Sequence, residues 1–180
     1  NDNIPENKAF IGFSKGFKKG GLNVPEIYNV SDDCEFYILE DLGNATLFHT
    51  QKDSNKRELT ILNYYQLALK HLKEFQYKGL DYIDLGLCYE TKQFDLQQIK
   101  IDEEKFSKHF LTFFDDIGKY STILNNVFEY INSELILADS EYFMFRDFQP
   151  RNIMVKNDDL YFIDYQSGRK GPLQYDLASF

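Results

Sequence analysis

Apolar residues recur at intervals of three and four near the beginning of the chain. Phe10, Phe13 and Phe17 fall on one face of a helix, and the glycine pair at 20–21 is a typical helix end. This spacing predicts a short amphipathic helix over 6–19.

Two short apolar runs follow, at 27–30 and 36–39, and a polar turn separates them, so we expect two strands there. A longer helical pattern comes next, with its apolar positions at Leu62, Tyr65, Leu69, Leu72 and Phe75. Asn55 followed three residues later by Glu58 is typical of a capping box. The pattern therefore predicts a long helix over 56–78.

Phenylalanines at helical spacing over 106–114 and apolar positions over 124–131 predict two further helices. We expect their aromatic stripes to be core packing and not a cofactor-binding surface. The pattern then changes to short β-type runs, at 142–145, 153–155 and 160–163. The polar stretch at 156–159 predicts a hairpin turn between the last two runs. Because strands and helices do not alternate, the fold class is α+β.

Length and composition place the chain among ordinary folded proteins. It has 180 residues, a mass of 21.3 kDa and 43% hydrophobic residues, which fits one domain or two small lobes. A formal net charge of -9 argues against a nucleic acid or an anionic membrane as the main partner. No apolar run approaches the roughly 20 residues of a membrane span, so we expect neither a span nor a signal peptide.

Cysteine and histidine are too sparse to suggest a site. Cys34 and Cys88 do not make a disulfide framework, and we expect two buried or half-buried thiols in a reducing cytoplasm. His49, His71 and His109 lack metal-ligand spacing, which favours structural or surface roles.

Polar residues gather around the last apolar runs. Asp147 and Asn152 lie in the loop before the predicted hairpin, and Asp164 follows its second strand, so we expect all three at the same end of the hairpin. An acidic residue near a hydroxyl, with an amide and a second carboxylate as oxygen ligands for Mg²⁺, is what phosphoryl transfer requires. Each residue alone is an ordinary turn former. The interpretation depends on the Asp-x₄-Asn spacing, the hairpin and the following Ile-Asp occurring in this order.

At these residues the chain resembles the aminoglycoside phosphotransferase and choline kinase-like family, whose catalytic loop usually reads H-G-D-x-x-x-x-N and whose metal loop reads I-D-[FWY]. The corresponding stretches are Phe-Arg-Asp-Phe-Gln-Pro-Arg-Asn at 145–152 and Phe-Ile-Asp-Tyr-Gln at 162–166. Together with Gly-Pro at 171–172 and Tyr-Asp-Leu-Ala-Ser at 175–179, they look closest to one branch. That branch is the sugar kinases of cell-wall recycling, which phosphorylate N-acetylmuramate or N-acetylglucosamine at the anomeric hydroxyl.

The resemblance implies a protein-kinase-like fold that is only partly present. Residues 1–42 would be the remainder of the amino-terminal lobe and the hinge, and residues 43–180 a helical carboxy-terminal lobe. Neither a glycine-rich strand turn nor a strand lysine precedes Glu6, and the chain stops at Phe180, directly after Tyr-Asp-Leu-Ala-Ser. We therefore expect a piece of a longer chain, with segments missing at both ends.

The resemblance also implies where ATP binds. Glu40, Asp41 and Leu42 would form the hinge whose backbone meets the adenine, and Glu6 would orient the phosphate-binding lysine. The alternative for Glu6 is a favourable interaction with the helix dipole alone.

By the same resemblance, Asp147 would orient or deprotonate the acceptor hydroxyl, while Asn152 and Asp164 would hold Mg²⁺. Asp176 and Arg146 would brace the catalytic loop.

Two further positions bear on the same loop. Arg169 and Lys170, after the metal-binding aspartate, could face phosphate or sugar, and the alternative is a solvated loop. The family's histidine two positions before the catalytic aspartate is Phe145 here, so packing would replace a bracing hydrogen bond.

The implied function is a cytoplasmic kinase that uses ATP and Mg²⁺ to phosphorylate a hydroxyl group of a small molecule, in the first place an amino sugar. One alternative is an aminoglycoside or choline-type kinase, since the acidic net charge suits a cationic substrate. The other is a non-catalytic kinase-like binding module. Asp147, Asn152 and Asp164 argue against such a module, because it has no chemical reason to keep all three.

Overall fold

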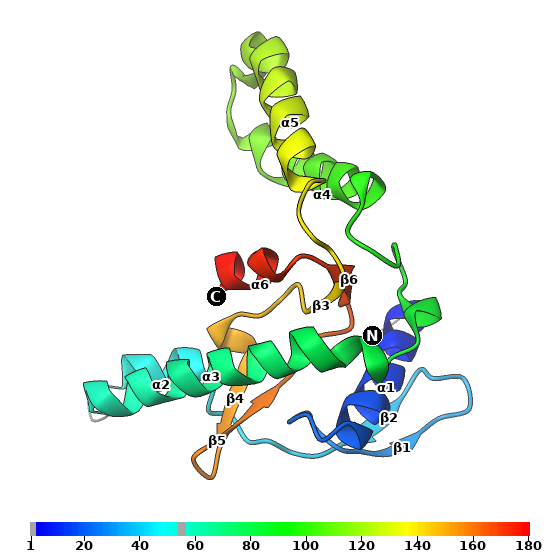
Figure 1. The fold of residues 1–180 in the computed structure, drawn as a ribbon, viewed down its shortest axis with the longest axis vertical. Coiled ribbons are helices and arrows are strands. Elements are labelled where there is room, and N and C mark those ends of the chain that lie inside the picture. The colour runs from blue at the N-terminus through cyan, green and yellow to red at the C-terminus, as the bar shows by residue number, and fades with distance from the viewer. Residues whose placement is uncertain (1–2, 54–56) are drawn as a thin grey trace.

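The computed structural model describes residues 3–53 and 57–180. Its helices and strands in chain order are α1 (Ile4–Lys19), β1 (Ile27–Val30), β2 (Tyr37–Leu39), α2 (Leu47–Lys52), α3 (Glu58–Lys78), α4 (Leu96–His109), α5 (Ser121–Leu135), β3 (Tyr142–Met144), β4 (Ile153–Lys156), β5 (Asp159–Phe162), β6 (Arg169–Gly171) and α6 (Leu173–Ser179). Figure 1 shows α4 and α5 projecting as an arm from a body that contains the other helices and the strands.

The beginning of the chain folds as its pattern predicts. The helix expected over 6–19 is confirmed as α1, and the side chain of Asn3 caps it by accepting the Glu6 N–H at 3.4 Å. Lys18 and Lys19 lie in its last turn, where they complement the helix dipole. The two expected strands are confirmed as β1 and β2, which pair antiparallel.

The long helix is confirmed as α3, but it begins at Glu58 and not at residue 56. The predicted capping residue Asn55 lies outside the described residues.

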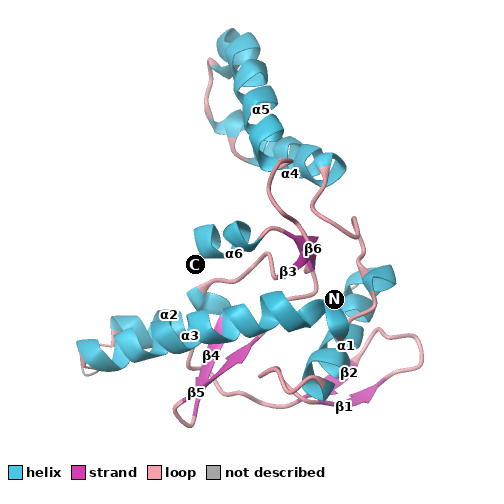
Figure 2. Cartoon of the chain, viewed as in Figure 1, coloured by secondary structure: helices cyan, strands magenta, loops and turns pink. Residues whose placement is uncertain are grey.

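The strands of the described ranges form three separate two-stranded antiparallel sheets, β1–β2, β3–β6 and β4–β5 (Figure 2). The predicted hairpin is confirmed as β4–β5, in which Ile153 faces Phe162 across the ladder. Its turn residues Asn157 and Asp158 have φ values of 53° and 62°, the left-handed pair that a two-residue hairpin turn requires.

A cluster of aromatic rings joins the amino-terminal helix to the hairpin and to the loop at 145–152. Phe17 of α1 contacts Phe75 of α3, Phe143 of β3 and Tyr165, with ring centroids 5.2 to 5.3 Å apart. All four rings are fully buried. Edge-to-face aromatic pairs each contribute about 0.5–1.5 kcal/mol beyond area burial. The cluster therefore stabilises the packing of α1 against α3 and β3. The same core takes side chains from both sides of residue 42, and the lobe boundary proposed there stays a prediction.

The arm corrects two predictions. The helix expected over 106–114 ends at His109 as α4, and a separate 3-10 helix covers Leu111–Phe113. Its aromatic stripe is not core packing, because Phe106 stacks on Phe110 while both side chains stay more than 40% exposed. The helix expected over 124–131 is confirmed as α5, but none of its residues is buried. The apolar stripes of α4 and α5 contact each other, but the described part of the body does not cover them.

Three short elements were not predicted: α2, β6 and α6. The helices α2 and α6 have six and seven residues, which is too short for a helical period to stand out, and the Arg-Lys-Gly sequence of β6 contains no apolar run. None of the helices in the described ranges is long and apolar enough to cross a membrane.

Candidate active site

The hairpin places two of the predicted site residues side by side. Asn152 precedes β4 and Asp164 follows β5, and the antiparallel register brings these two ends together. The amide nitrogen of Asn152 donates to Asp164 Oδ2 at 3.1 Å and to the backbone carbonyl of Asp147 at 2.9 Å. One side chain therefore ties together all three residues that the sequence singled out.

Two residues of this region have a left-handed backbone. Arg146 has φ 76° and Asp164 has φ 67°, although neither is glycine. For a residue with a β-carbon this conformation costs roughly 1–2 kcal/mol, and it persists only where the surroundings impose it. Its occurrence at both ends of the candidate site marks the site as one that the rest of the fold holds in place.

The buried carboxylate of Asp176 holds the loop that carries Asp147. Its two oxygens accept the backbone N–H groups of Phe145 and Arg146, each at 2.9 Å, and Gln76 of α3 donates to it at 3.2 Å. Burial raises the pKa of Asp176 to about 6, although the two backbone hydrogen bonds act in the opposite direction. These contacts are those of a loop brace, the role that the resemblance implies.

Phe145 takes the place where the resembled family has histidine. The ring is buried and packs against Phe75, Phe148 and Tyr165 with centroids 5.4 to 5.9 Å apart. An apolar ring that packs into the core therefore stands where the family has a hydrogen-bonding side chain, as expected from the sequence.

Asp147 lines a cavity of about 590 Å³ between the arm, the loop at 145–152 and α6. Other side chains around this cavity are Phe94, Glu134, Gln149, Gln174 and Tyr175. Burial raises the pKa of the Asp147 carboxyl, the nearby Asp164 raises it further, and the Arg146 and Arg151 charges lower it in part. The carboxylate is consequently a better proton acceptor than an exposed aspartate.

Asn152 and Asp164 face a second cavity, of about 420 Å³, on the side of α1 and β2. Glu6 and Leu39 also line it. Gln166, which was not among the predicted site residues, donates to Asp164 Oδ1 at 2.8 Å and to Glu6 Oε1 at 3.2 Å. Its place two residues after Asp164 is the signal that could have identified it.

The candidate hinge is tied to the hairpin by a lysine that sequence reasoning missed. Lys156 Nζ lies 2.8 Å from Glu40 Oε1 and donates to the backbone carbonyl of Asp41 at 3.0 Å. The hydrogen bond from Lys156 lowers the pKa of Glu40. Since the Glu40 N–H donates to Glu26, an adenine at the hinge would have to use other backbone groups, such as those of Leu42.

The structure corrects the expectation for Arg169 and leaves that for Lys170 a prediction. They lie in β6, and the side chain of Arg169 is only 1% exposed and contacts Glu90, Thr91 and Gln98. Lys170 pairs with Glu141 at 2.7 Å. Neither the ligand contact nor the solvated loop therefore applies to Arg169, because pairing of β6 with β3 turns its guanidinium into the interior.

The donor set fits a magnesium ion bound together with phosphates, and not a metal held by protein alone. Within the described ranges, no group of three or more His, Cys, Asp or Glu residues is arranged to hold a metal. Asn152 and Asp164 present one amide and one carboxylate at one place. Mg²⁺ is usually bound through one or two carboxylates plus substrate phosphates, so two such residues suffice.

Comparison with known proteins finds matches to a family model, to a curated protein and to solved structures. The sequence model described as "Phosphotransferase enzyme family" matches residues 5–180. The N-acetylmuramate/N-acetylglucosamine kinase of Neisseria meningitidis serogroup B is 25% identical over 162 residues, which are 88% of this chain and 46% of that protein. The structure of the streptomycin-ATP-APH(2")-IIa ternary complex superposes with a TM-score of 0.63 and 16% identity, over 98% of this chain and 60% of that one. This chain thus spans about half the length of the curated relative.

The brace leads to a prediction about pH. Because the pKa of Asp176 is about 6 in the fold and 3.8 in the reference state, the folded protein holds an extra proton between these values. Stability from this group is therefore greatest below about pH 4 and falls as pH rises to about 6, by on the order of 3 kcal/mol. In urea unfolding from pH 4 to 7, the wild-type free energy minus that of Asp176→Asn should fall across this window.

Asp32→Asn, at an exposed turn residue, is a matched control because it removes no buried carboxylate. The unfolding free energy of wild type minus that of Asp32→Asn should not fall between pH 4 and 7. A difference between wild type and Asp176→Asn that grows with pH would mean that the three hydrogen bonds outweigh burial.

Proposed function

The chain belongs to the phosphotransferase enzyme family, and on that premise we propose that the protein transfers the γ-phosphate of ATP to a hydroxyl group of a small molecule. The protein-kinase-like fold predicted from the sequence is confirmed by the superposition with the streptomycin-ATP-APH(2")-IIa complex. One observation carries the proposal: Asn152 donates hydrogen bonds to the backbone of Asp147, which lines one cavity, and to the side chain of Asp164, which lines another. A phosphoryl donor and its acceptor need adjoining sites of this kind.

In the proposed arrangement the nucleotide occupies the 420 Å³ cavity, where Asn152 and Asp164 would hold Mg²⁺. The ion would neutralise charge on the phosphates when bound. Leu39 also lines this cavity and adjoins Glu40, which supports a hinge at Glu40, Asp41 and Leu42. Glu6 is proposed to orient a phosphate-binding lysine, and its hydrogen bond from Gln166 would hold it beside Asp164.

The acceptor is proposed to enter the 590 Å³ cavity, where Asp147 would orient its hydroxyl and accept its proton. Burial and the charge of Asp164 raise the pKa of Asp147, which suits it to receive a proton. Asp176 and Arg146 would keep the carboxylate in place through the loop. Positioning and electrostatics would then supply the acceleration, with little covalent chemistry left for the protein.

An amino sugar is the acceptor we propose first. The 25% identical relative is named for N-acetylmuramate and N-acetylglucosamine, which supports this choice. The cavity itself combines the aromatic rings of Phe94 and Tyr175 with the amides of Gln149 and Gln174. Ring faces suit the apolar side of a sugar, and amides suit its hydroxyl and acetamido groups.

An aminoglycoside or choline-type acceptor is the second candidate. Glu134 lines the same cavity as Asp147, and two carboxylates favour a cationic substrate. A non-catalytic binding module is the remaining alternative, and the following substitutions separate it from both kinases.

Replacing the proposed base should abolish transfer and spare nucleotide binding. In the complete protein, Asp147→Asn should lower kcat by about 10²–10⁴-fold, because general base and orienting roles have that magnitude. The Kd for Mg-ATP should stay near the wild-type value, since this side chain acts on the acceptor. Steady-state kinetics and calorimetry measure the two quantities. Asp116→Asn, at an aspartate about 70% exposed on the arm, is the control, and equal rates for both variants would contradict the role of Asp147.

Removing the proposed carboxylate ligand should weaken Mg²⁺ binding measurably. Asp164→Asn should raise the Mg²⁺ concentration for half-maximal activity by at least roughly tenfold, since even indirect partners of a metal commonly have effects of this size. Mn²⁺ should replace Mg²⁺ because both prefer oxygen ligands, whereas soft metals should not. Wild-type activity that survives excess EDTA would remove Asn152 and Asp164 from the metal-binding role.

The product distinguishes the acceptors. With N-acetylglucosamine or N-acetylmuramate the complete protein should form a sugar 1-phosphate, which mild acid hydrolyses because the phosphate is a glycosyl ester. Phosphorus NMR before and after acid treatment identifies it. An acid-stable product, or faster turnover of kanamycin or choline, would contradict the assignment to the anomeric sugar kinases and favour another branch of the family.

A further inference from the structure

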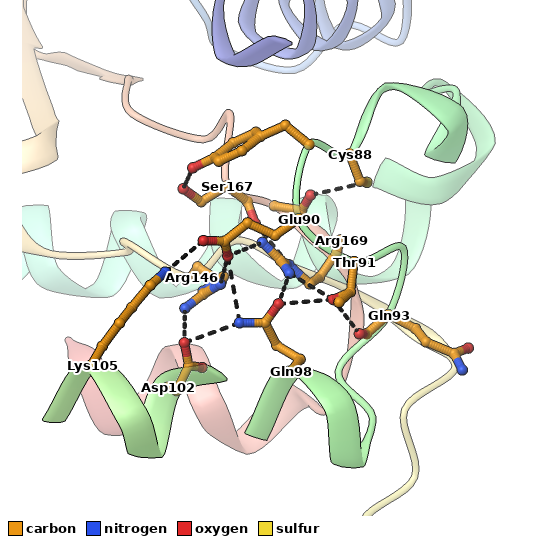
Figure 3. Close-up of polar contacts among 12 residues, drawn as sticks. Cys88, Glu90, Thr91, Gln93, Gln98, Asp102, Lys105, Arg146, Ser167 and Arg169 are labelled. Carbon is orange, nitrogen blue, oxygen red and sulfur yellow. Dashed lines mark hydrogen bonds and ion pairs between the residues drawn. The ribbon is translucent and has the colours of Figure 1, made fainter. Parts of the chain in front are cut away.

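A cluster of polar and charged side chains has Glu90 at its centre and includes Arg146, the residue before Asp147 (Figure 3). This residue belongs to the connector between the 3-10 helix Leu85–Leu87 and α4. Glu90 Oε1 accepts from Lys105 at 2.5 Å, while Oε2 accepts from Arg146 at 3.1 Å and from Arg169 at 3.2 Å. A single carboxylate therefore binds three cationic side chains.

Arg146 has a second acidic partner on the arm. Its Nη2 donates to Asp102 Oδ1 of α4 at 2.7 Å. The guanidinium thus bridges the connector and α4, and its side chain is only 12% exposed. Charge-assisted hydrogen bonds from its two terminal nitrogens to two different carboxylates fix this guanidinium in position and in orientation.

The backbone around Glu90 is itself fixed. Gln93 forms a parallel β-bridge with Lys170, the Phe94 N–H donates to the Lys170 carbonyl at 2.8 Å, and the Lys170 N–H donates to the Lys92 carbonyl at 3.2 Å. Since β6 pairs with β3, the connector belongs to the same strand group that leads into the catalytic loop. Glu90 is therefore held at a set place relative to Arg146.

Charge makes Glu90 the indispensable member of the cluster. Arg146, Arg169 and Lys105 carry three positive charges, against which stand the carboxylates of Glu90 and Asp102. Without Glu90 the excess doubles from one positive charge to two, and the buried guanidinium groups of Arg146 and Arg169 lose the anion between them. Two neighbouring cations that lose a shared anion repel each other, so Arg146, left with Asp102 as its one acidic partner in the cluster, would turn towards solvent.

Arg146 is also the left-handed residue next to Asp147. Its φ of 76° is held at the backbone by the bond from its N–H to Asp176 and at the side chain by Glu90 and Asp102. Release of the side chain removes one of the two restraints on an unfavourable backbone conformation. The carboxylate of Asp147 would then shift relative to Asn152 and Asp164.

We propose that Glu90 is a positioning residue for phosphoryl transfer: it holds Arg146 in its left-handed turn and, through Arg146, sets the place of the Asp147 carboxylate. The inference rests on the proposed function but not on which acceptor is used. It also makes α4 of the arm part of the catalytic assembly, because Asp102 and Lys105 of that helix bind the same cluster.

The test compares Glu90→Gln with Glu141→Gln in the complete protein, with Mg-ATP and N-acetylglucosamine. Glu141 also pairs with a cation, Lys170, but is 73% exposed and far less constrained. Glu90→Gln should lower kcat by about 10²-fold, since a small displacement of a catalytic group has effects of this size, and leave the KM for Mg-ATP near wild type. Glu141→Gln should change neither quantity.

A double-substitution cycle identifies the route. If Glu90 acts through Arg146, then Glu90→Gln combined with Arg146→Gln should be no slower than Arg146→Gln alone. Multiplied losses, or an increase in the KM for Mg-ATP that accounts for the whole defect, would overturn the proposal. Should Glu90→Gln fail to fold, Asp102→Asn replaces it, because it removes the second anchor of Arg146 at a partly exposed site, and an unchanged kcat would then overturn the positioning of Arg146.

A readout without catalysis separates this inference from the proposed function. If wild type phosphorylates none of the acceptors, the proposed function fails, and amide hydrogen exchange of Phe145 and Arg146 still tests the anchor. Those amides should exchange faster in Glu90→Gln than in wild type or Glu141→Gln. Equal exchange in all three proteins would show that Asp176 alone holds the loop and would overturn the role of Glu90.

Discussion

The site depends on one buried carboxylate that binds two consecutive backbone amides. Two neighbouring N–H groups reach the same anion only where the chain curls, as in an anion-binding nest, and Asp176 imposes that curl on Phe145 and Arg146. The left-handed turn at Arg146 is the local consequence. It diverts the chain from β3 into the loop that carries Asp147 and ends at the hairpin. Because Asp176 lies in α6 and Gln76 in α3, the loop is held by elements distant in sequence.

The two faces of this loop are stabilised by opposite means. One face carries Phe145 and Phe148, which pack into a cluster of rings where no charge is needed. The other face carries Arg146, whose charge is balanced by Glu90 and Asp102. Large rings resist displacement because a close-packed core has no space for them to move into. Ion pairs add direction, since each guanidinium bond has a preferred geometry, so the loop is restrained in position by one face and in orientation by the other.

The features that could be predicted from the sequence are those that depend on the local pattern of apolar and polar residues. The β4–β5 hairpin was predictable because a polar turn lies between two apolar runs, and its register then brings Asn152 to Asp164. The family resemblance, which the match over residues 5–180 confirms, supplied the roles proposed for these residues. The burial of Arg169 was not predictable, because it follows from pairing of β6 with β3 across an intervening stretch of more than twenty residues. The exposure of the phenylalanines on the arm has the same origin, since spacing reveals a helical face but not whether anything covers it.

The environment of Asp147, which lines the 590 Å³ cavity, has features that would disfavour a purely structural carboxylate. Burial disfavours its ionised form, and so does the neighbouring Asp164, which together raise the pKa of Asp147. A structural carboxylate would gain from a cation placed directly against it, yet the guanidinium next to it in sequence is bound to Glu90 and Asp102. Arg146 thus lowers that pKa only in part and leaves the carboxylate available to a hydroxyl group. Two acidic residues therefore bind the arginine adjacent to Asp147, and this arrangement supports the proposed role of Asp147 as a base more than a purely structural role.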